Sequence, residues 1–156
     1  MHPRVQKDRY QGSPRWEPYG ATLERAPFPV AYNGDIFGVD DLNALLDAYP
    51  ATQHVMLGRG IVANPALARM IRGGNPATLD ELAHFHDRLF CEYEALMGAD
   101  NAAARMKEWW SYAKCCFADS ASVHLAVRGV RGQAEYMEAV ERILGTEALA
   151  DEPRLR

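Results

Sequence analysis

The sequence has little cysteine, no apolar leader and no long apolar segment. Its three cysteines, Cys91, Cys115 and Cys116, lack the even count of a disulfide framework and the CxxC spacing of a zinc site. Adjacent Cys115 and Cys116 are best explained as small apolar packing residues. No apolar run approaches the roughly 18 residues of a membrane span, and the first residues do not resemble a signal peptide. We therefore expect reduced thiols, no metal, no membrane segment and a cytoplasmic location.

The charge balance gives no global attraction to nucleic acid but leaves room for a local one. The chain has 17 Lys and Arg against 21 Asp and Glu, a formal net charge of −4. A basic cluster on one face could still bind RNA, because binding follows the distribution of charge as well as the total. With 156 residues and 48% hydrophobic content, the sequence is typical of one ordinary globular domain or two small ones.

Two short apolar segments, each followed by a glycine-containing turn, characterise the first half. Residues 28–32 precede the turn at 33–35 (Asn-Gly-Asp), and residues 55–57 precede the turn at 58–60 (Gly-Arg-Gly). Their continuous apolar character predicts parallel strands covered on both faces. Two such strands cannot close a sheet, so this region looks like the end of a larger β/α array.

Helical spacing of apolar residues accounts for most of the remaining chain. The predicted helices are 16–23, 39–49, 65–73, 79–97, 101–117, 120–128 and 133–144. No strand is predicted after residue 60, and the last four helices read as a small antiparallel bundle. The predicted domains are an incomplete β/α domain over 1–74, a helical domain over 75–147 and a polar tail over 148–156.

The two glycine turns favour a phosphate site. Backbone N–H groups of such turns and helix N-termini attract phosphate, and Arg59 adds a planar cation for bidentate binding. The alternative is that glycine simply serves the strand-to-helix turns of any β/α protein.

The two glycine turns resemble the C-terminal part of the tRNA-dihydrouridine synthases. The residues around the first turn (29–36) and the Asn-Pro pair at 64–65 share this resemblance. Residues 2–4 (His-Pro-Arg), with Lys7, Asp8 and Tyr10 after them, are similar to the family's His-x-Arg segment beside the flavin. Residues 104–112 look most like the branch that modifies uridine 16. The resemblance covers nearly the whole chain. It implies the last β/α units of a TIM-type (β/α)8 barrel followed by a C-terminal antiparallel helical bundle.

The resemblance implies an oxidoreductase of tRNA processing, a flavoprotein that uses FMN and NADPH to reduce a D-loop uridine to 5,6-dihydrouridine. The residues that would bind the FMN phosphate and ribityl end, with His2 near the ring, are His2, Asn33, Gly34, Asp35, Gly58 and Arg59. Pro3, Val5 and Arg9 depart from the family's common residues. The family's catalytic cysteine and a flavin-contacting lysine have no counterpart in this sequence. We therefore expect a C-terminal portion that is inactive alone, with an upstream barrel fragment as a partner.

A basic and aromatic stretch predicts the tRNA contact, because unpaired bases stack on aromatic rings. The residues concerned are Arg105, Lys107, Trp109, Tyr112, Lys114 and Arg128. Adjacent Trp109 and Trp110 cannot both point inward on one helix, so we expect at least one near the surface. The alternative is that one Trp fills the bundle core and the charges form a solvated face.

Other titratable residues point to structure rather than chemistry. Asp35, Asp40 and Asp41 are expected to cap helix starts, not to form an acid–base pair. His84 and His86 lie two apart on a helix, which is poor metal geometry, and both are expected at or near the surface.

Two other functions remain open from the sequence. One is a non-catalytic RNA-binding helical module or an inert remnant. The other is an unrelated flavin or sugar-phosphate barrel fragment, since phosphate turns recur among barrels. Salt-dependent tRNA binding would favour the first, and the second gives no reason for the basic helix at 105–112.

Overall fold

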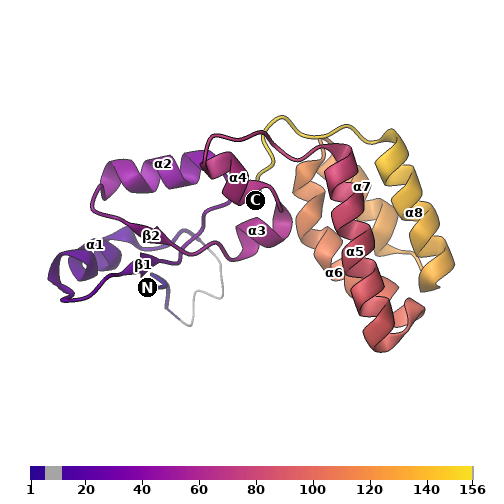
Figure 1. The fold of residues 1–156 in the computed structure, drawn as a ribbon, viewed down its shortest axis with the longest axis horizontal. Helices are drawn as coiled ribbons and strands as arrows, with labels where there is room; N and C mark the ends of the chain where they lie inside the picture. Colours follow the sequence, from indigo (N-terminus) through magenta and orange to yellow (C-terminus); the bar gives the residue numbers. More distant parts are fainter. Residues whose placement is uncertain (6–11, 156) are drawn as a thin grey trace.

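The computed structural model describes residues 1–5 and 12–155, which form a small β/α part and a helical bundle beside it (Figure 1). Lys7, Asp8 and Tyr10, which belong to the predicted His-x-Arg region, lie outside the described residues, as does Arg9.

The β/α part is organised around one pair of parallel strands. Its elements are α1 (Trp16–Arg25), β1 (Ala31–Tyr32), α2 (Val39–Ala48), β2 (His54–Val55), α3 (Arg59–Ala63) and α4 (Leu67–Ile71). Ala31 pairs with His54 and Tyr32 with Val55. The predicted order of strand, turn and helix, twice repeated, is therefore confirmed, although the strands are shorter than the apolar segments. A strand extends only as far as its backbone groups find a neighbouring chain.

The predicted helix at 65–73 is wrong in its bounds. A short helix, α3, begins earlier at Arg59, and α4 covers only Leu67–Ile71. Asn64 separates the two helices, and its side-chain oxygen accepts a hydrogen bond from Ala66 N at 3.0 Å. This local bond offers the backbone an alternative to continuous helix.

The helical bundle follows the predicted elements closely. It contains α5 (Leu79–Met97), α6 (Ala99–Ala113), the 3-10 turn η2 (Lys114–Cys116), α7 (Ser120–Arg128) and α8 (Gly132–Thr146). A capping box starts α5, because the Thr78 hydroxyl accepts from Glu81 N and the Glu81 carboxylate accepts from Thr78 N. Gly98 has a φ of 80°, which lets α5 end and α6 begin within a single residue.

Helix α6 is the centre of the bundle, and this explains an error in the sequence prediction. It contacts α5, α7 and α8 within the bundle and α3 of the β/α part. Trp109 and Trp110 are therefore both buried, with 7% and 1% of their surface exposed. The expectation that one of them lies near the surface fails because α3 and α5 cover the side of α6 that carries Trp109. The exposed side of α6 carries Ala104, Arg105 and Glu108 instead.

The bundle core contains a polar network around His86, which we expected at or near the surface. His86 is fully buried. Trp110 Nε1 donates to the Tyr136 hydroxyl at 2.9 Å, and that hydroxyl lies 2.6 Å from His86 Nε2. Because the hydroxyl already accepts from Trp110, it donates to Nε2, and the neutral imidazole donates through Nδ1 to Asp87 at 2.9 Å. Burial lowers the pKa of His86 and raises the pKa of Tyr136.

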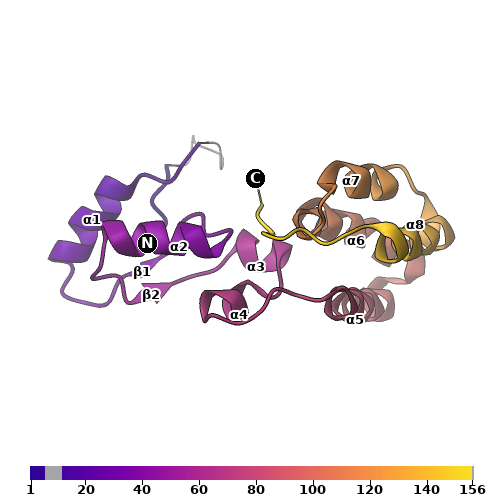
Figure 2. The ribbon, with the colours of Figure 1, turned by 90° about the horizontal axis from the view of Figure 1, so that it is seen from above.

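The C-terminal segment, predicted as a polar tail, is fixed by backbone pairing. Leu149 forms an isolated antiparallel bridge with Phe117, although no strand follows β2 among the described residues, as predicted. Ala150 N donates to Cys116 O at 2.9 Å, and Arg154 pairs with Asp41 of α2. Figure 2 shows this segment running from α8 back to the middle of the molecule. The tail thus connects the bundle to the β/α part.

None of the helices that the structure describes is long and apolar enough to cross a bilayer. Nor do residues 1–5 and 12–155 bring together three His, Cys, Asp or Glu side chains that could hold a metal ion.

Candidate functional site

The two glycine turns meet at a cavity of about 300 Å³ on the β/α part. This phosphate-turn cavity is lined by all six residues for which the sequence suggests cofactor binding: His2, Asn33, Gly34, Asp35, Gly58 and Arg59. Ile36, Phe37, Met56 and Gly60 also line it. The turns therefore converge in space as the sequence predicts.

Glycine is required at two points because backbone and side chains approach closely there. A Cβ atom on Gly60 would lie 2.1 Å from the carbonyl oxygen of Ile36. A Cβ atom on Gly34 would lie 2.1 Å from the Tyr32 hydroxyl. No real Cβ contact is this short. Gly60 thus lets the second turn touch the residue that follows the first turn, whereas Gly34 leaves room for the side chain of Tyr32 from the strand before it.

Asp35 is the central charged group of the phosphate-turn cavity. Arg59 Nη2 lies 2.7 Å from its Oδ1, and the Arg4 guanidinium pairs with its Oδ2. The Arg4 side chain is only 3% exposed. Two guanidinium groups thus meet one carboxylate at the wall of the cavity. Arg4 was not among the predicted cofactor-binding residues. It belongs, however, to the His-Pro-Arg segment that is similar to the family's His-x-Arg segment.

The cap of α2 is Asp41, and this corrects the predicted role of Asp35. The Asp41 carboxylate accepts hydrogen bonds from Phe37 N at 2.8 Å and Gly38 N at 2.9 Å. The donors at the start of α2 therefore already have an acceptor within the chain. An anion in the cavity would depend on the second turn and on Arg59, whose guanidinium stacks over the Phe37 ring at 5.2 Å.

The first residues of the chain lie beside β1. The Met1 amino group donates to Ala31 O, and Asn33 N donates to Met1 O at 2.8 Å. His2 is exposed, and its Nδ1 donates to the Asn33 carbonyl at the edge of the cavity. The backbone pairing with β1 thus positions His2 beside the first turn.

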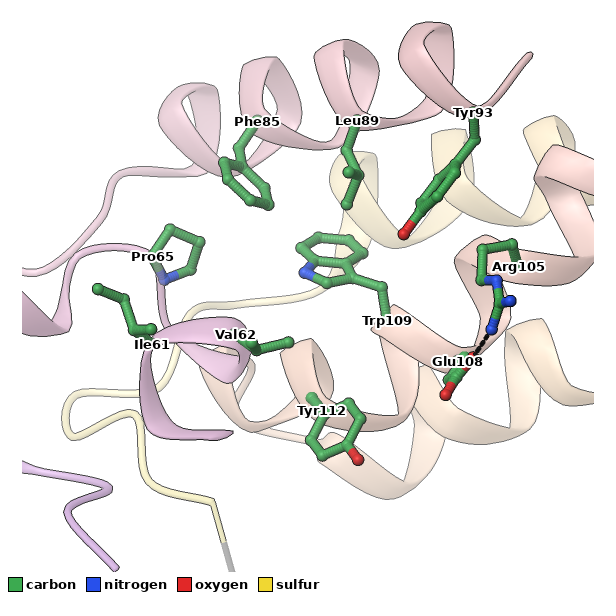
Figure 3. A pocket seen from close by; sticks show the side chains of 10 residues that line it. All are labelled: Ile61, Val62, Pro65, Phe85, Leu89, Tyr93, Arg105, Glu108, Trp109 and Tyr112. Carbon is green, nitrogen blue, oxygen red and sulfur yellow. Dashed lines mark hydrogen bonds and ion pairs between the residues drawn. The ribbon is translucent and has the colours of Figure 1, made fainter. Parts of the chain in front are cut away.

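The residues for which we predicted RNA contact do not share one surface. Arg105, Trp109 and Tyr112 line a second, larger cavity of about 650 Å³ (Figure 3). Lys107 instead donates through Nζ to Val130 O at 2.6 Å. Lys114 is half-buried in η2 and Arg128 is exposed at the end of α7. The structure therefore distributes the predicted RNA-binding residues over α6, η2 and α7, and only Arg105, Trp109 and Tyr112 line one cavity.

The larger cavity, here called the α3–α5–α6 cavity, lies where the β/α part meets the bundle. Ile61, Val62 and Pro65 line it from α3 and the residues after that helix. Phe85, Leu89 and Tyr93 line it from α5, and Arg105, Glu108, Trp109 and Tyr112 from α6. Arg105 and Glu108 form an ion pair at its edge, so the cavity is close to neutral. Helix periodicity in the sequence predicted the helices α5 and α6 that carry part of this lining. It did not predict α3, which carries Ile61 and Val62.

The cysteines do not line the phosphate-turn cavity. Cys116 is buried, and its thiol donates to Ala63 O at 3.3 Å, which fixes η2 against the end of α3. The hydrogen bond with Cys115 and burial raise the pKa of the Cys116 thiol, so this side chain stays protonated. Cys91 is exposed on α5.

Comparison with known proteins identifies the family of the chain. Residues 1–112 match the sequence model of a family described as Dihydrouridine synthase (Dus). The chain is 29% identical over 153 residues to the tRNA-dihydrouridine(16) synthase of Ralstonia nicotianae, with 92% of this chain and 45% of that protein covered. The protein of the same name from Neisseria meningitidis serogroup A is 30% identical over 151 residues, with 92% of this chain and 44% of the relative covered.

A third relative of that name, from Cupriavidus necator, is 28% identical over 154 residues, with 93% of this chain and 46% of the relative covered. The chain thus spans less than half the length of these relatives. Their shared name is also that of the uridine-16 branch to which the helix at 104–112 is similar. The match over residues 1–112 includes both glycine turns and most of α6. The chain belongs to the dihydrouridine synthase family.

Proposed function

We propose that the phosphate-turn cavity binds the phosphate and ribityl end of FMN. The observation that carries this proposal is the Arg4–Asp35–Arg59 cluster between two glycine turns that touch. A guanidinium group can bind phosphate oxygens through parallel N–H bonds. The ion pair with Asp35 holds the guanidinium group of Arg59 beside the second turn. The first N–H groups of a helix have no acceptor within the helix, so those at the start of α3 can add donors.

The size of the cavity fits part of a flavin. Small-molecule sites usually enclose about 300 to 1,000 Å³, and this cavity holds about 300 Å³. Its volume suits the phosphate and the adjoining chain, with the flavin ring extending past His2. A carboxylate that already accepts from two arginines retains lone pairs for a hydroxyl group, so Asp35 is suited to the ribityl chain.

In the complete protein, we propose, this site serves the reduction of a tRNA uridine to 5,6-dihydrouridine. Bound FMN, reduced by NADPH, would supply the hydride for the C5–C6 double bond. The residues described above would bind and orient the cofactor. Since Cys91, Cys115 and Cys116 all lie outside the phosphate-turn cavity, we expect this chain alone to have no reductase activity. Formation of dihydrouridine in tRNA by the purified chain with FMN and NADPH would contradict this.

Titration of FMN into the full chain, followed by quenching of flavin fluorescence, tests the cofactor site. Arg59→Ala should weaken binding about 10- to 100-fold, the value of a charge-assisted hydrogen bond. Arg88→Ala is the matched control, because Arg88 is exposed on α5 and lies outside this cavity. Equal effects of the two substitutions would show that the cavity does not bind the phosphate.

We further propose that the bundle contacts tRNA through the basic side chains of η2 and α7. Arg128 is exposed on α7, and Lys114 is half-exposed in η2. A gel-shift titration against tRNA at low and high salt tests this, because phosphate contacts weaken steeply with salt. Binding of tRNA without binding of FMN would favour the alternative function of a non-catalytic RNA-binding module.

The short sheet supports a third proposal, that an upstream barrel segment covers the strands in the complete protein. Phe28, just before β1, and Met56, just after β2, are 66% and 56% exposed. Parallel strands normally have apolar side chains covered on both faces. Mixing this chain with the portion of the Ralstonia nicotianae relative outside the match should yield a complex on gel filtration. Two separate peaks would contradict the proposal.

A further inference from the structure

The α3–α5–α6 cavity contains a buried hydrogen-bond donor that has no acceptor. Trp109 Nε1 is inaccessible to solvent, and no described residue lies within hydrogen-bond reach of it. The side chain as a whole is 93% buried, since 7% of it is exposed. A buried donor without a hydrogen-bond acceptor destabilises a folded protein, so such donors are rare. Where one occurs, it marks a position at which an acceptor is missing.

The other two tryptophans show how the chain treats the same group elsewhere. Trp16 Nε1 donates to the Tyr32 hydroxyl at 3.0 Å, and Trp110 Nε1 donates to the Tyr136 hydroxyl at 2.9 Å. Trp109 has no such tyrosine, although its indole N–H faces α3 across the cavity (Figure 3). The donor at Trp109 is therefore positioned toward whatever occupies the cavity.

The lining restricts the chemistry of that occupant. Phe85 lies 5.7 Å from Trp109 between ring centroids and is 38% exposed, so the opening has an aromatic edge. Tyr93 and Tyr112 add further rings from α5 and α6. The charges at the edge cancel, because Arg105 is paired with Glu108. An anion gains nothing in such a cavity, whereas a flat neutral ring with an acceptor atom would meet both the ring faces and the indole N–H.

We propose that this cavity binds one unpaired nucleobase of an RNA strand, with Trp109 Nε1 donating to an acceptor on the edge of the base. Every nucleobase has a π-face and edge acceptors, and unpaired bases are the part of RNA that proteins read by stacking and edge hydrogen bonds. The volume of about 650 Å³ leaves room for the attached ribose. The proposal rests on the proposed RNA contact for its source of bases, but neither Lys114 nor Arg128 lines the cavity.

The indole N–H signals of the ¹⁵N-labelled full chain test the proposal directly. Titration with a single-stranded hexamer of uridine should shift the Trp109 signal, assigned by its loss in Trp109→Phe. The Trp16 and Trp110 signals should stay in place, because both groups already have acceptors. A hexamer of the same backbone without bases should leave all three unmoved. Uridine monophosphate, added alone, reports whether the base binds without the strand.

Substitutions test the same contact by affinity. Trp109→Phe keeps an aromatic ring but removes the donor, and should weaken hexamer binding about 2- to 10-fold. Val62→Phe fills the cavity from its exposed wall, where a failure to fold is not expected, and should weaken binding at least as much. Leu125→Phe, on an exposed position of α7 outside the cavity, is the matched control and should leave binding unchanged.

The outcomes separate this proposal from the proposed RNA contact. Binding of tRNA with movement of the Trp109 signal supports both. Binding of tRNA without that movement overturns the base site and leaves a contact through basic side chains alone. Movement with uridine monophosphate but no binding of tRNA or hexamer supports a nucleobase cavity and contradicts its use in RNA binding. Absence of both overturns both.

Discussion

The helical bundle and the β/α part place their polar groups differently. In the bundle, the polar network of His86, Tyr136 and Trp110 lies inside a closed apolar core, and its members satisfy one another. In the β/α part, the Arg4–Asp35–Arg59 cluster lies at a cavity beside a sheet of two short strands, and Phe28 and Met56 remain exposed. The bundle therefore has the features of a unit stabilised from within. The β/α part has those of a surface arranged for something else to bind.

The largest expected effect tests whether stability resides in the bundle. Trp110→Ala should lower the free energy of unfolding by about 3–5 kcal/mol, because it removes a fully buried ring and the donor to Tyr136. Trp16→Ala in the β/α part is the matched control, since Trp16 also donates to a tyrosine but is only half-buried. Trp16→Ala should lower the free energy of unfolding by less than half as much as Trp110→Ala. Urea unfolding followed by circular dichroism measures both, and equal losses would remove the contrast between the two parts.

The next effect concerns the contact between the glycine turns. Gly60→Ala places a Cβ atom against the Ile36 carbonyl and should destabilise the chain by about 1–3 kcal/mol through overpacking. Gly58→Ala in the same turn meets no atom within 4 Å and should change stability by less than about 0.5 kcal/mol. Thermal unfolding of the two variants measures the difference. A similar melting temperature for both would show that the turns do not need to touch.

The smallest effect is a pH dependence that belongs to the bundle. Burial lowers the pKa of His86 below 6.5, although Asp87 partly opposes this. The unfolded chain therefore takes up the proton first, so the stability from His86 is fully present above about pH 6.5 and declines below it. Urea midpoints at about pH 7.5 and 5.5 should show the decline, and His84→Asn, at an exposed position, should retain it. A midpoint that stays level or rises on acidification would contradict the proposed hydrogen-bond direction.

The sequence was sufficient for the elements whose signals are local. The apolar spacing over residues 79–97 predicted α5, and the apolar runs before the two turns predicted a parallel pair of strands. Five residues of the two turns, and His2 from the His-Pro-Arg segment, were singled out by the family resemblance, and all six line one cavity. Glycine and helix-cap signals act over a few residues, so they survive in the sequence without knowledge of the rest of the fold.

Non-local contacts account for the errors. The burial of His86 depends on Tyr136, which lies 50 residues away, and the burial of Trp109 depends on the cover that α3 and α5 give to α6. The tail was predicted to be merely polar, yet its backbone pairs with Phe117 and Cys116 and its Arg154 reaches Asp41. None of these contacts has a signal in the local pattern.

The sequence by itself determined the family, the order of the elements and the two glycine turns, because each depends on residue types at short spacing. Only the tertiary structure decided that Asp35 joins Arg4 and Arg59 rather than capping α2, and that the Trp109 donor faces a cavity without an acceptor. The physical reason is that hydrogen-bond satisfaction and burial depend on which distant segments meet. These contacts, not the local pattern, determine which polar groups are left for a ligand.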